Sequence, residues 1–275
     1  MKILNTRENL NNEVLAIKTY AKRYGTQKNK VLVYNLSLGN LFQSIIARFR
    51  GKKIYWYRHE CTTFLEKLEN NNFFYAVLTI LGEIAFSLIS TKICTGSPLT
   101  SKKYKIDFCP LLKPVISSDK HERDIDILYF GREDPRRSPQ LLASLKKNTN
   151  FKIVQAGGPE NRVTEQEKTE LFRRAKIVLN RYTNSIGQSG VTPEALSYGC
   201  VVIISEYDYV SNICELQNNF FLIKSYISDD SATKMIRTYI KNFDFVHNSA
   251  SVNRIDKYFG RQAFENYWAP FLDLR

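Results

Sequence analysis

The chain has 275 residues, 43% of them hydrophobic and 24% charged, with 12 glycines and 8 prolines. This composition indicates a folded globular protein of about two domains and excludes a collagen-like chain, a disordered tail and a low-complexity scaffold. Forty Lys and Arg residues against 27 Asp and Glu residues give a net charge of +13. That excess favours an anionic partner, although the basic residues are scattered among acidic ones and form no block.

Apolar runs rich in β-branched residues alternate with helical patterns in the first part of the chain. Strands that alternate with helices indicate βαβ units and a parallel sheet. The opening MKIL is compatible with one further short strand. Strands are predicted at residues 30–34, 53–57 and 92–95, and helices at residues 8–23, 41–48 and 72–89.

The segment FFYAVLTILGEIAFSLIS, residues 73–90, is the most apolar part of the sequence. It is shorter than the ~20 apolar residues that cross a bilayer and it contains Glu83, so a buried or membrane-surface helix is favoured over a span. The N-terminus lacks the apolar core of a secretory signal, and the five cysteines show neither zinc-ligand spacing nor a disulfide framework. We therefore expect a cytoplasmic protein.

Residues 110–124 contain two prolines, two serines and mixed charges, a composition typical of a linker. The linker separates a short N-terminal domain, residues 1–116, from a C-terminal domain, residues 117–275. Helices are predicted to begin after Ser138 and after Thr164, where Glu167 completes a capping box. The order of elements predicts an α/β protein with two Rossmann-like domains in tandem. In the second domain the predicted strands are 125–130, 151–155, 176–180, 201–205 and 220–223, and further helices cover 229–241 and 253–268.

The loop GREDPRRSP, which follows the first strand of the second domain, is the first candidate site. Gly131 permits a tight turn, and Arg132 and Arg137 lie five residues apart. Two guanidinium groups at this place could each bind phosphate oxygens through paired hydrogen bonds. The alternative is a solvated basic loop paired with Glu133 and Asp134.

The segment SIGQSGVTPEALSYGCVVI is the second candidate site. Thr192 is predicted as a helix N-cap and Pro193 as the first helical residue. The first turn would direct its N–H groups, with those of Gly190 and Val191, at a phosphate. Glu194 comes too early to complete a capping box, so it is placed either to accept hydrogen bonds from ribose hydroxyls or only to interact with the helix dipole.

These motifs, in this order, resemble the nucleotide-sugar-binding half of GT-B glycosyltransferases, especially family four. The resemblance covers about residues 125–223 through ILYFGREDPRRSPQLL, FKIVQAGGP, AKIVLN and GVTPEALSYGCVVIIS. It implies that Arg132 and Arg137 neutralise a donor diphosphate and that Glu194 binds ribose. The implied donor-binding residues are Gly131, Arg132, Arg137, Gly158, Gln188, Ser189, Gly190, Val191, Thr192 and Glu194.

The sequence departs from the family pattern at two positions. Arg137 stands where the family has Lys, which keeps the charge but changes the donor geometry. The family's Glu-x7-Glu motif would need a carboxylate at Ile186, and its first Glu usually contacts the sugar. Sugar recognition and the choice between retention and inversion are therefore open, and Gln188 could substitute in part.

His59 and Glu60 are the catalytic candidates of the first domain. Arg132 and Arg137 are the catalytic candidates of the second domain. His59 and Glu60 both follow the predicted strand 53–57, where the loops of a parallel sheet face the ligand. The resemblance implies that one of them acts as a base on an acceptor hydroxyl or hydrogen-bonds the sugar. The alternative is that His59 only satisfies local hydrogen bonds.

The sequence thus predicts a glycosyltransferase of polysaccharide biosynthesis that moves a sugar from a nucleotide-sugar to a glycan or lipid-linked glycan. No D-x-D motif is evident, so no metal or other cofactor is expected. The net charge and the apolar helix suggest peripheral contact with the anionic inner face of the plasma membrane. The alternatives are an inactive glycosyltransferase-like binding subunit and a nucleic-acid-binding protein, but no nucleic-acid-binding motif is seen.

The last segment, residues 253–274, combines a helical pattern with a long apolar stripe. That is more aromatic surface than one edge of a small domain normally leaves exposed. The resemblance implies that this terminal helix returns to the first domain. The stripe consists of Ile255, Tyr258, Phe259, Phe264, Tyr267, Trp268 and Phe271.

Overall fold

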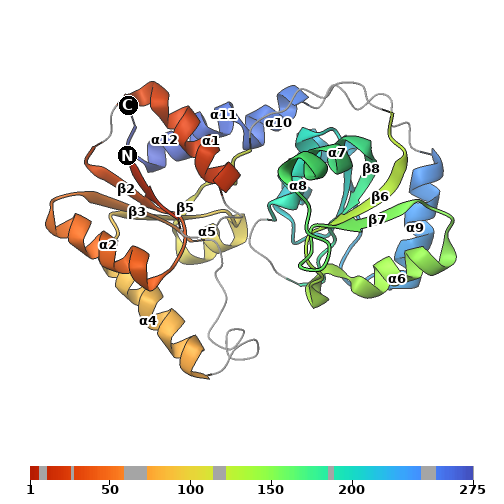
Figure 1. Ribbon diagram of the computed structural model, residues 1–275, viewed down its shortest axis with the longest axis horizontal. Helices are drawn as coiled ribbons and strands as arrows, with labels where there is room; N and C mark the ends of the chain where they lie inside the picture. Colours follow the sequence, from red (N-terminus) through yellow and green to blue (C-terminus); the bar gives the residue numbers. More distant parts are fainter. Residues whose placement is uncertain are drawn as a thin grey trace. The chain divides into compact units, whose positions relative to one another are not determined.

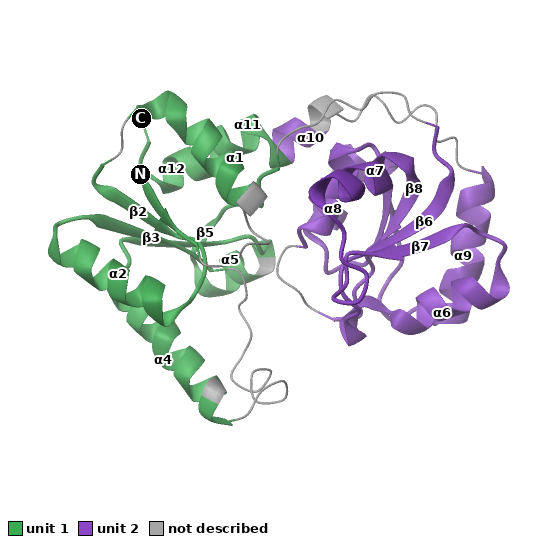
Figure 2. Cartoon of the chain, in the orientation of Figure 1, with its two compact units in different colours: residues 1–113, 259–275 green, residues 114–258 purple. Residues whose placement is uncertain are grey.

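The chain forms two compact units, each built on a parallel β-sheet (Figures 1 and 2). Unit 1 contains Met1–Lys113 and Phe259–Arg275, and unit 2 contains Pro114–Tyr258. The predicted fold class, two α/β units in tandem, is confirmed. The computed structural model describes residues 1–5, 11–25, 28–58, 73–113, 122–184, 189–242 and 252–274.

The sheet of unit 1 has the strand order β1-β2-β3-β4-β5, with every neighbouring pair parallel. The strands predicted at 30–34, 53–57 and 92–95 are present, and the opening MKIL supplies a short first strand. The fifth strand has only two residues, too few for a pattern in the sequence. The strands are β1 (Lys2–Leu4), β2 (Lys30–Val33), β3 (Lys53–Arg58), β4 (Lys92–Thr95) and β5 (Asp107–Phe108).

Helices cover both faces of this sheet, with α1, α11 and α12 on one face and α2 and α4 on the other (Figure 1). Helix α2 starts three residues earlier than predicted because Ser37 caps it, accepting a hydrogen bond from the Asn40 N–H at 3.1 Å. The helices are α1 (Asn11–Ala21), α2 (Leu38–Phe49), α4 (Phe73–Ile89), α5 (Pro98–Tyr104), α11 (Arg261–Ala263) and α12 (Ala269–Phe271), with a 3-10 turn at Lys22–Tyr24 and a π-helical turn at Phe264–Trp268.

The C-terminal segment forms part of the unit 1 core. Trp268 is fully buried, with its ring centroid 5.3 Å from that of Tyr57 and its Nε1 donating to the Pro110 carbonyl oxygen at 2.8 Å. Asp273 accepts hydrogen bonds from Lys92 at 2.6 Å and from the Tyr55 hydroxyl at 2.8 Å. These contacts bind the end of the chain to strands β3 and β4.

Unit 2 has the strand order β10-β9-β8-β6-β7, again parallel throughout. The predicted capping box of Thr164 and Glu167 is confirmed, and Ser138 stands at the predicted N-cap position of α6, although its side chain makes no cap hydrogen bond. The strands are β6 (Ile125–Phe130), β7 (Ile153–Ala156), β8 (Ala175–Leu179), β9 (Val201–Ile204) and β10 (Phe220–Leu222). The helices are α6 (Pro139–Asn148), α7 (Glu165–Arg174), α8 (Val191–Ser197), α9 (Asp229–Asn242) and α10 (Val252–Phe259), with 3-10 turns at Pro135–Arg137, Tyr209–Asn212 and Cys214–Asn219.

The start of α8 differs from the prediction. The helix begins at Val191, with Gly190 as N-cap, and Thr192 lies inside the first turn. The prediction of Thr192 as N-cap was wrong because its hydroxyl is used in buried side-chain hydrogen bonds instead of capping the helix. Pro193 is tolerated there because the first turn of a helix needs no N–H donor at that position.

Candidate functional site

The loop after β6 is shaped to hold the guanidinium of Arg137. Gly131 ends the strand with a φ of 106°, a backbone conformation that residues with a side chain rarely adopt. A Cβ at Gly131 would lie 2.9 Å from Nη1 of Arg137, so only glycine leaves space for this arginine. Gly158 lies beside the same turn, since its Cβ position would be 3.6 Å from Cα of Arg132.

Arg137 is buried and lies against main chain and aromatic surface. Its guanidinium carbon is 4.4 Å from the ring centroid of Tyr129, and its Nη atoms donate to the carbonyl oxygens of Arg132 at 3.3 Å and Leu179 at 3.4 Å. Its Nε has no hydrogen-bond partner among the described residues. The arginine is therefore fixed in place with donor capacity left over.

The acidic residues of this loop pair elsewhere. Asp134 binds Arg136 at 2.7 Å, and this hydrogen-bonded guanidinium lowers the pKa of Asp134. Glu133 accepts a hydrogen bond from Gln155 at 2.7 Å. In the part of the chain that the structure describes, Asp134 forms its ion pair with Arg136, and neither Arg132 nor Arg137 is ion-paired, although the charge of Arg132 also lowers the pKa of Asp134.

A buried polar network supports the start of α8. Nδ2 of Asn180 donates to Oγ of Ser189 at 3.0 Å and to Oγ1 of Thr192 at 2.8 Å. Thr192 in turn donates to Oδ2 of Asp208 at 2.7 Å, and the Val210 N–H donates to Oδ1 at 3.1 Å. The side chains of Ser189 and Thr192 therefore hold the loop, and the main chain is what the loop can offer to a ligand.

Asp208 makes the stability of this network pH-dependent. Burial disfavours the carboxylate and raises its pKa to about 6, although hydrogen bonds from Thr192 and Val210 oppose the shift. The folded state therefore holds a proton between about pH 4 and 6 that the unfolded state has released, and stability falls as the pH rises through this window.

We expect Asp208→Asn to abolish this loss. Relative to the variant, the wild-type protein should lose about 3 kcal/mol of unfolding free energy between pH 4 and pH 7, the equivalent of its pKa shift. Urea unfolding at a series of pH values, followed through residues of unit 2 because the two units need not unfold in one step, measures the difference. Asp230→Asn, on an exposed part of α9, is the control for removing one charge, and equal pH profiles for the two variants would contradict the expectation.

Glu194 lies in the first turn of α8 and pairs with a lysine that the sequence analysis did not identify. Its Oε1 is 2.9 Å from Nζ of Lys168, which also contacts Glu165 at 2.6 Å. Burial lowers the pKa of Lys168, but its two carboxylates more than offset this and the pKa is raised. Lys168 thus stays charged and orients the Glu194 carboxylate.

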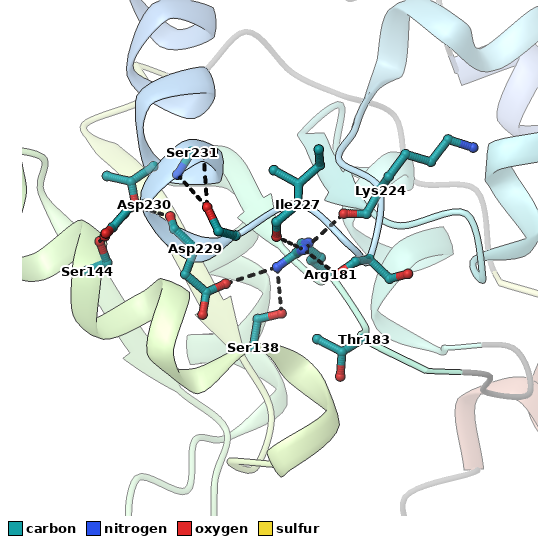
Figure 3. Close-up of polar contacts among 12 residues, drawn as sticks. Ser138, Ser144, Arg181, Thr183, Lys224, Ile227, Asp229, Asp230 and Ser231 are labelled. Carbon is teal, nitrogen blue, oxygen red and sulfur yellow. Dashed lines mark hydrogen bonds and ion pairs between the residues drawn. The ribbon is translucent and has the colours of Figure 1, made fainter.

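Arg181 anchors the loop between β10 and α9 (Figure 3). Its buried guanidinium donates to Ser138 at 3.0 Å and to Asp229 at 3.1 Å. The same group donates to three carbonyl oxygens of the loop, those of Lys224, Ser225 and Ile227, at 2.8–3.0 Å. The loops that follow β6, β8 and β10 are therefore held together at one edge of the sheet.

Some of the predicted site residues lie together at this edge of the sheet, and others lie outside the described residues. Gly131, Arg132 and Arg137 lie in the loop after β6, Gly158 lies beside this loop after β7, and Ser189–Glu194 follow β8. His59, Glu60, Ile186 and Gln188 lie outside the described residues. The residues missed by the sequence analysis are Lys168, Asn180, Arg181 and Asp208; Asn180 and Arg181 could have been found as polar residues directly after a buried strand.

A surface depression of about 850 Å³ lies elsewhere in unit 2, along β7 and α7. It is lined by residues such as Gln155, Thr164 and Glu170, and by none of the predicted donor-binding residues. Within the described ranges, no group of three or more His, Cys, Asp and Glu side chains is arranged to hold a metal ion.

Solved structures share the fold of this chain. TarM from S. aureus matches with a TM-score of 0.63 at 14% identity, over 95% of this chain and 58% of TarM. Anabaena HepE in complex with UDP matches with a TM-score of 0.63 at 12% identity, over 94% of this chain and 82% of HepE. A glycosyltransferase involved in avilamycin A biosynthesis gives 0.60 at 12% identity, over 94% of this chain and 78% of that one.

These comparisons establish the fold as that of GT-B glycosyltransferases. The chain spans less than two thirds of the length of TarM. No protein-family model matches the sequence, and no curated protein matches it.

Proposed function

We propose that this protein is a glycosyltransferase that uses a nucleotide-sugar donor, bound at the carboxyl edge of the unit 2 sheet. The observation that carries the proposal is the guanidinium of Arg137, buried, unpaired with any described carboxylate and held beside the Gly131 turn. The fold supports the same conclusion, because HepE was solved with UDP and with UDP-glucose, and TarM with UDP. UDP is therefore the first nucleotide to test.

In this proposal the arginines stabilise the leaving diphosphate. Arg137 is already oriented by Tyr129 and two carbonyl oxygens, so little reorganisation is needed as negative charge develops on the leaving group. Arg132 is exposed and can close on the same phosphates. The Val191 N–H donates to Oγ of Ser189 at 3.3 Å, so the two guanidinium groups and the main chain of Gly190 supply the charge stabilisation, and we propose transfer without a metal ion.

Glu194 is proposed to bind the donor ribose, and this assignment can be tested directly. We expect Glu194→Gln to weaken UDP binding about tenfold or more, since a hydrogen bond to a charged group contributes about 1.5–3 kcal/mol. Isothermal titration calorimetry measures the change.

Glu165→Gln is the matched control for this test. It removes the other carboxylate of Lys168 but lies on exposed surface of α7, so UDP affinity should be unchanged. Equal losses in the two variants would show that Glu194 acts only through its lysine.

The acceptor part of the proposal concerns unit 1. We propose a glycan or lipid-linked glycan acceptor, with His59 or Glu60 as the base or sugar contact, in a cytoplasmic protein associated with the inner face of the plasma membrane. HepE was solved with UDP and glucose, and TarM with fondaparinux and alpha-GlcNAc-glycerol, which supports a carbohydrate acceptor class.

A thermal-shift panel of UDP, GDP, CMP and ADP sugars tests the function as a whole. The matching donor at 100 times its dissociation constant should stabilise unit 2 by about 2.7 kcal/mol. Release of the nucleoside diphosphate with an added glycan acceptor then shows transfer. Stabilisation without turnover would favour the inactive binding subunit, and no stabilisation by any nucleotide sugar would refute the donor site.

A further inference from the structure

Helix α2 exposes large apolar side chains to solvent. Leu38, Phe42, Ile46 and Phe49 recur every three or four residues, which places them on one side of the helix, and they are 37–89% exposed. Its two buried side chains are polar: Asn40 donates to Oδ1 of Asn35 at 2.8 Å, and Ser44 donates to the Asn40 carbonyl oxygen at 2.6 Å. Leu41 and Ala47 pack against the core, so the helix carries apolar side chains on both its inner and its outer side.

Helix α4 lies against α2 on the same face of the sheet and continues the apolar surface (Figure 1). Phe74, Leu78, Leu81, Ile84 and Leu88 are 47–80% exposed, while Ala76 and Phe86 are buried toward the sheet. Within the described residues, no helix is long and apolar enough to cross a bilayer. We call the nine exposed side chains named here, four on α2 and five on α4, the α2–α4 face. Monomeric proteins rarely expose a contiguous apolar surface of this kind without a partner.

Positive charge flanks the α2–α4 face. Glu83 is the one acidic residue within the sequences of α2, α4 and α5, and it is paired with Arg58 at 2.7 Å. Arg58 also lies over the ring of Tyr104, 5.4 Å from its centroid, so the end of α5 adjoins α4. The exposed basic residues of these elements are Arg48 and Arg50 at the end of α2, and Lys102, Lys103 and Lys105 on and after α5.

We propose that the α2–α4 face binds the surface of an anionic phospholipid membrane. The apolar side chains would enter the boundary between headgroups and acyl chains, and the flanking arginines and lysines would contact lipid phosphates. A second copy of the chain fits less well, because a two-fold contact would bring the same basic residues of both copies together. The α2–α4 face thus supplies the residues of the membrane contact proposed above. Membrane binding does not depend on the donor site, because α2 and α4 belong to unit 1 and the donor site to unit 2.

Vesicle flotation tests this surface with the whole protein. Wild-type protein should float with vesicles of phosphatidylcholine containing phosphatidylglycerol, and about tenfold less with phosphatidylcholine alone. Leu81→Ser combined with Phe42→Ser should abolish flotation. Leu15→Ser on α1 is the matched control, since Leu15 and Leu81 are 58% and 56% exposed on opposite faces of the sheet.

A charge variant and two further measurements complete the test. Arg48→Gln with Lys102→Gln should reduce flotation with anionic vesicles and leave binding to neutral ones unchanged. Circular dichroism and UDP affinity should be unaltered in every variant, which separates this result from failure of the donor site. Wild-type protein that floats with neither vesicle, or a dimer in sedimentation that Phe42→Ser dissociates, would overturn the proposal.

Discussion

Replacing Arg137 with Ala is expected to lower UDP affinity about ten- to a hundredfold while leaving uridine binding unchanged. The reason is that a charge-assisted hydrogen bond to phosphate contributes about 1.5–3 kcal/mol, and this guanidinium is already fixed before the ligand arrives. With a donor and acceptor identified, kcat/KM should fall roughly 10²–10³-fold. Calorimetry with the two ligands separates the phosphate contribution from that of the nucleoside.

Two neighbouring substitutions control this experiment. Arg136→Ala removes a guanidinium from the same 3-10 turn, but one that is paired with Asp134, so UDP affinity should stay near the wild-type value. Arg137→Lys keeps the charge and should restore part of the binding. If Arg137→Ala weakens uridine and UDP equally, the arginine supports the fold of the loop and does not bind the diphosphate.

Trp268→Ala is expected to cost about 3–5 kcal/mol of stability, the largest effect of a single substitution in unit 1. The fully buried indole packs against Tyr57 and Tyr34, and its N–H is bonded to the Pro110 carbonyl oxygen, so the variant leaves both a cavity and an unpaired acceptor. Because a protein of two units need not unfold in one step, hydrogen exchange is the suitable measurement. Amides of β2 and β3 should lose protection, and those of β6 and β8 should not.

Tyr226→Ala serves as the control for removing an aromatic side chain. Tyr226 is 79% exposed, and its loss should change stability by less than about 0.5 kcal/mol. Unchanged protection of β2 and β3 in Trp268→Ala would mean that the C-terminal segment does not support the sheet of unit 1.

The regular elements could be predicted from the sequence because their patterns are local. Long strands such as Ile125–Phe130 and the capping box at Thr164 carry their signals within a few residues. Strand β5 and helix α5 were missed, because two and seven residues are too short to show a period. The start of α8 was predicted at the wrong residue because the Thr192 hydroxyl donates its hydrogen bond to Asp208, sixteen residues away. A pattern of neighbouring residues cannot reveal a partner at that distance.

The residues of the candidate site also differ in whether the sequence alone reveals them. Arg132, Arg137 and Glu194 stand in motifs that can be recognised along the chain. The residues that position them are distant in sequence: Lys168 reaches Glu194 from α7, and Arg181 joins loops 43–48 residues away. Arg181 carries one local signal, its place directly after a buried strand, but nothing in the sequence distinguishes Lys168 from an ordinary surface charge until the sheet order is known.

Unit 1 is built from two segments that are far apart in the sequence, which affects how it folds during synthesis on the ribosome. Unit 2 is one continuous stretch, so all its strands have been synthesised before the last residues emerge. Unit 1 lacks Phe264, Trp268 and Phe271 of its core until residues 259–275 have been synthesised. The N-terminal unit, although made first, must therefore complete its folding second, reversing the usual order of nascent domains. Until then, Tyr34 after β2 and Tyr55 and Tyr57 of β3 lack the aromatic partners that the C-terminal segment supplies.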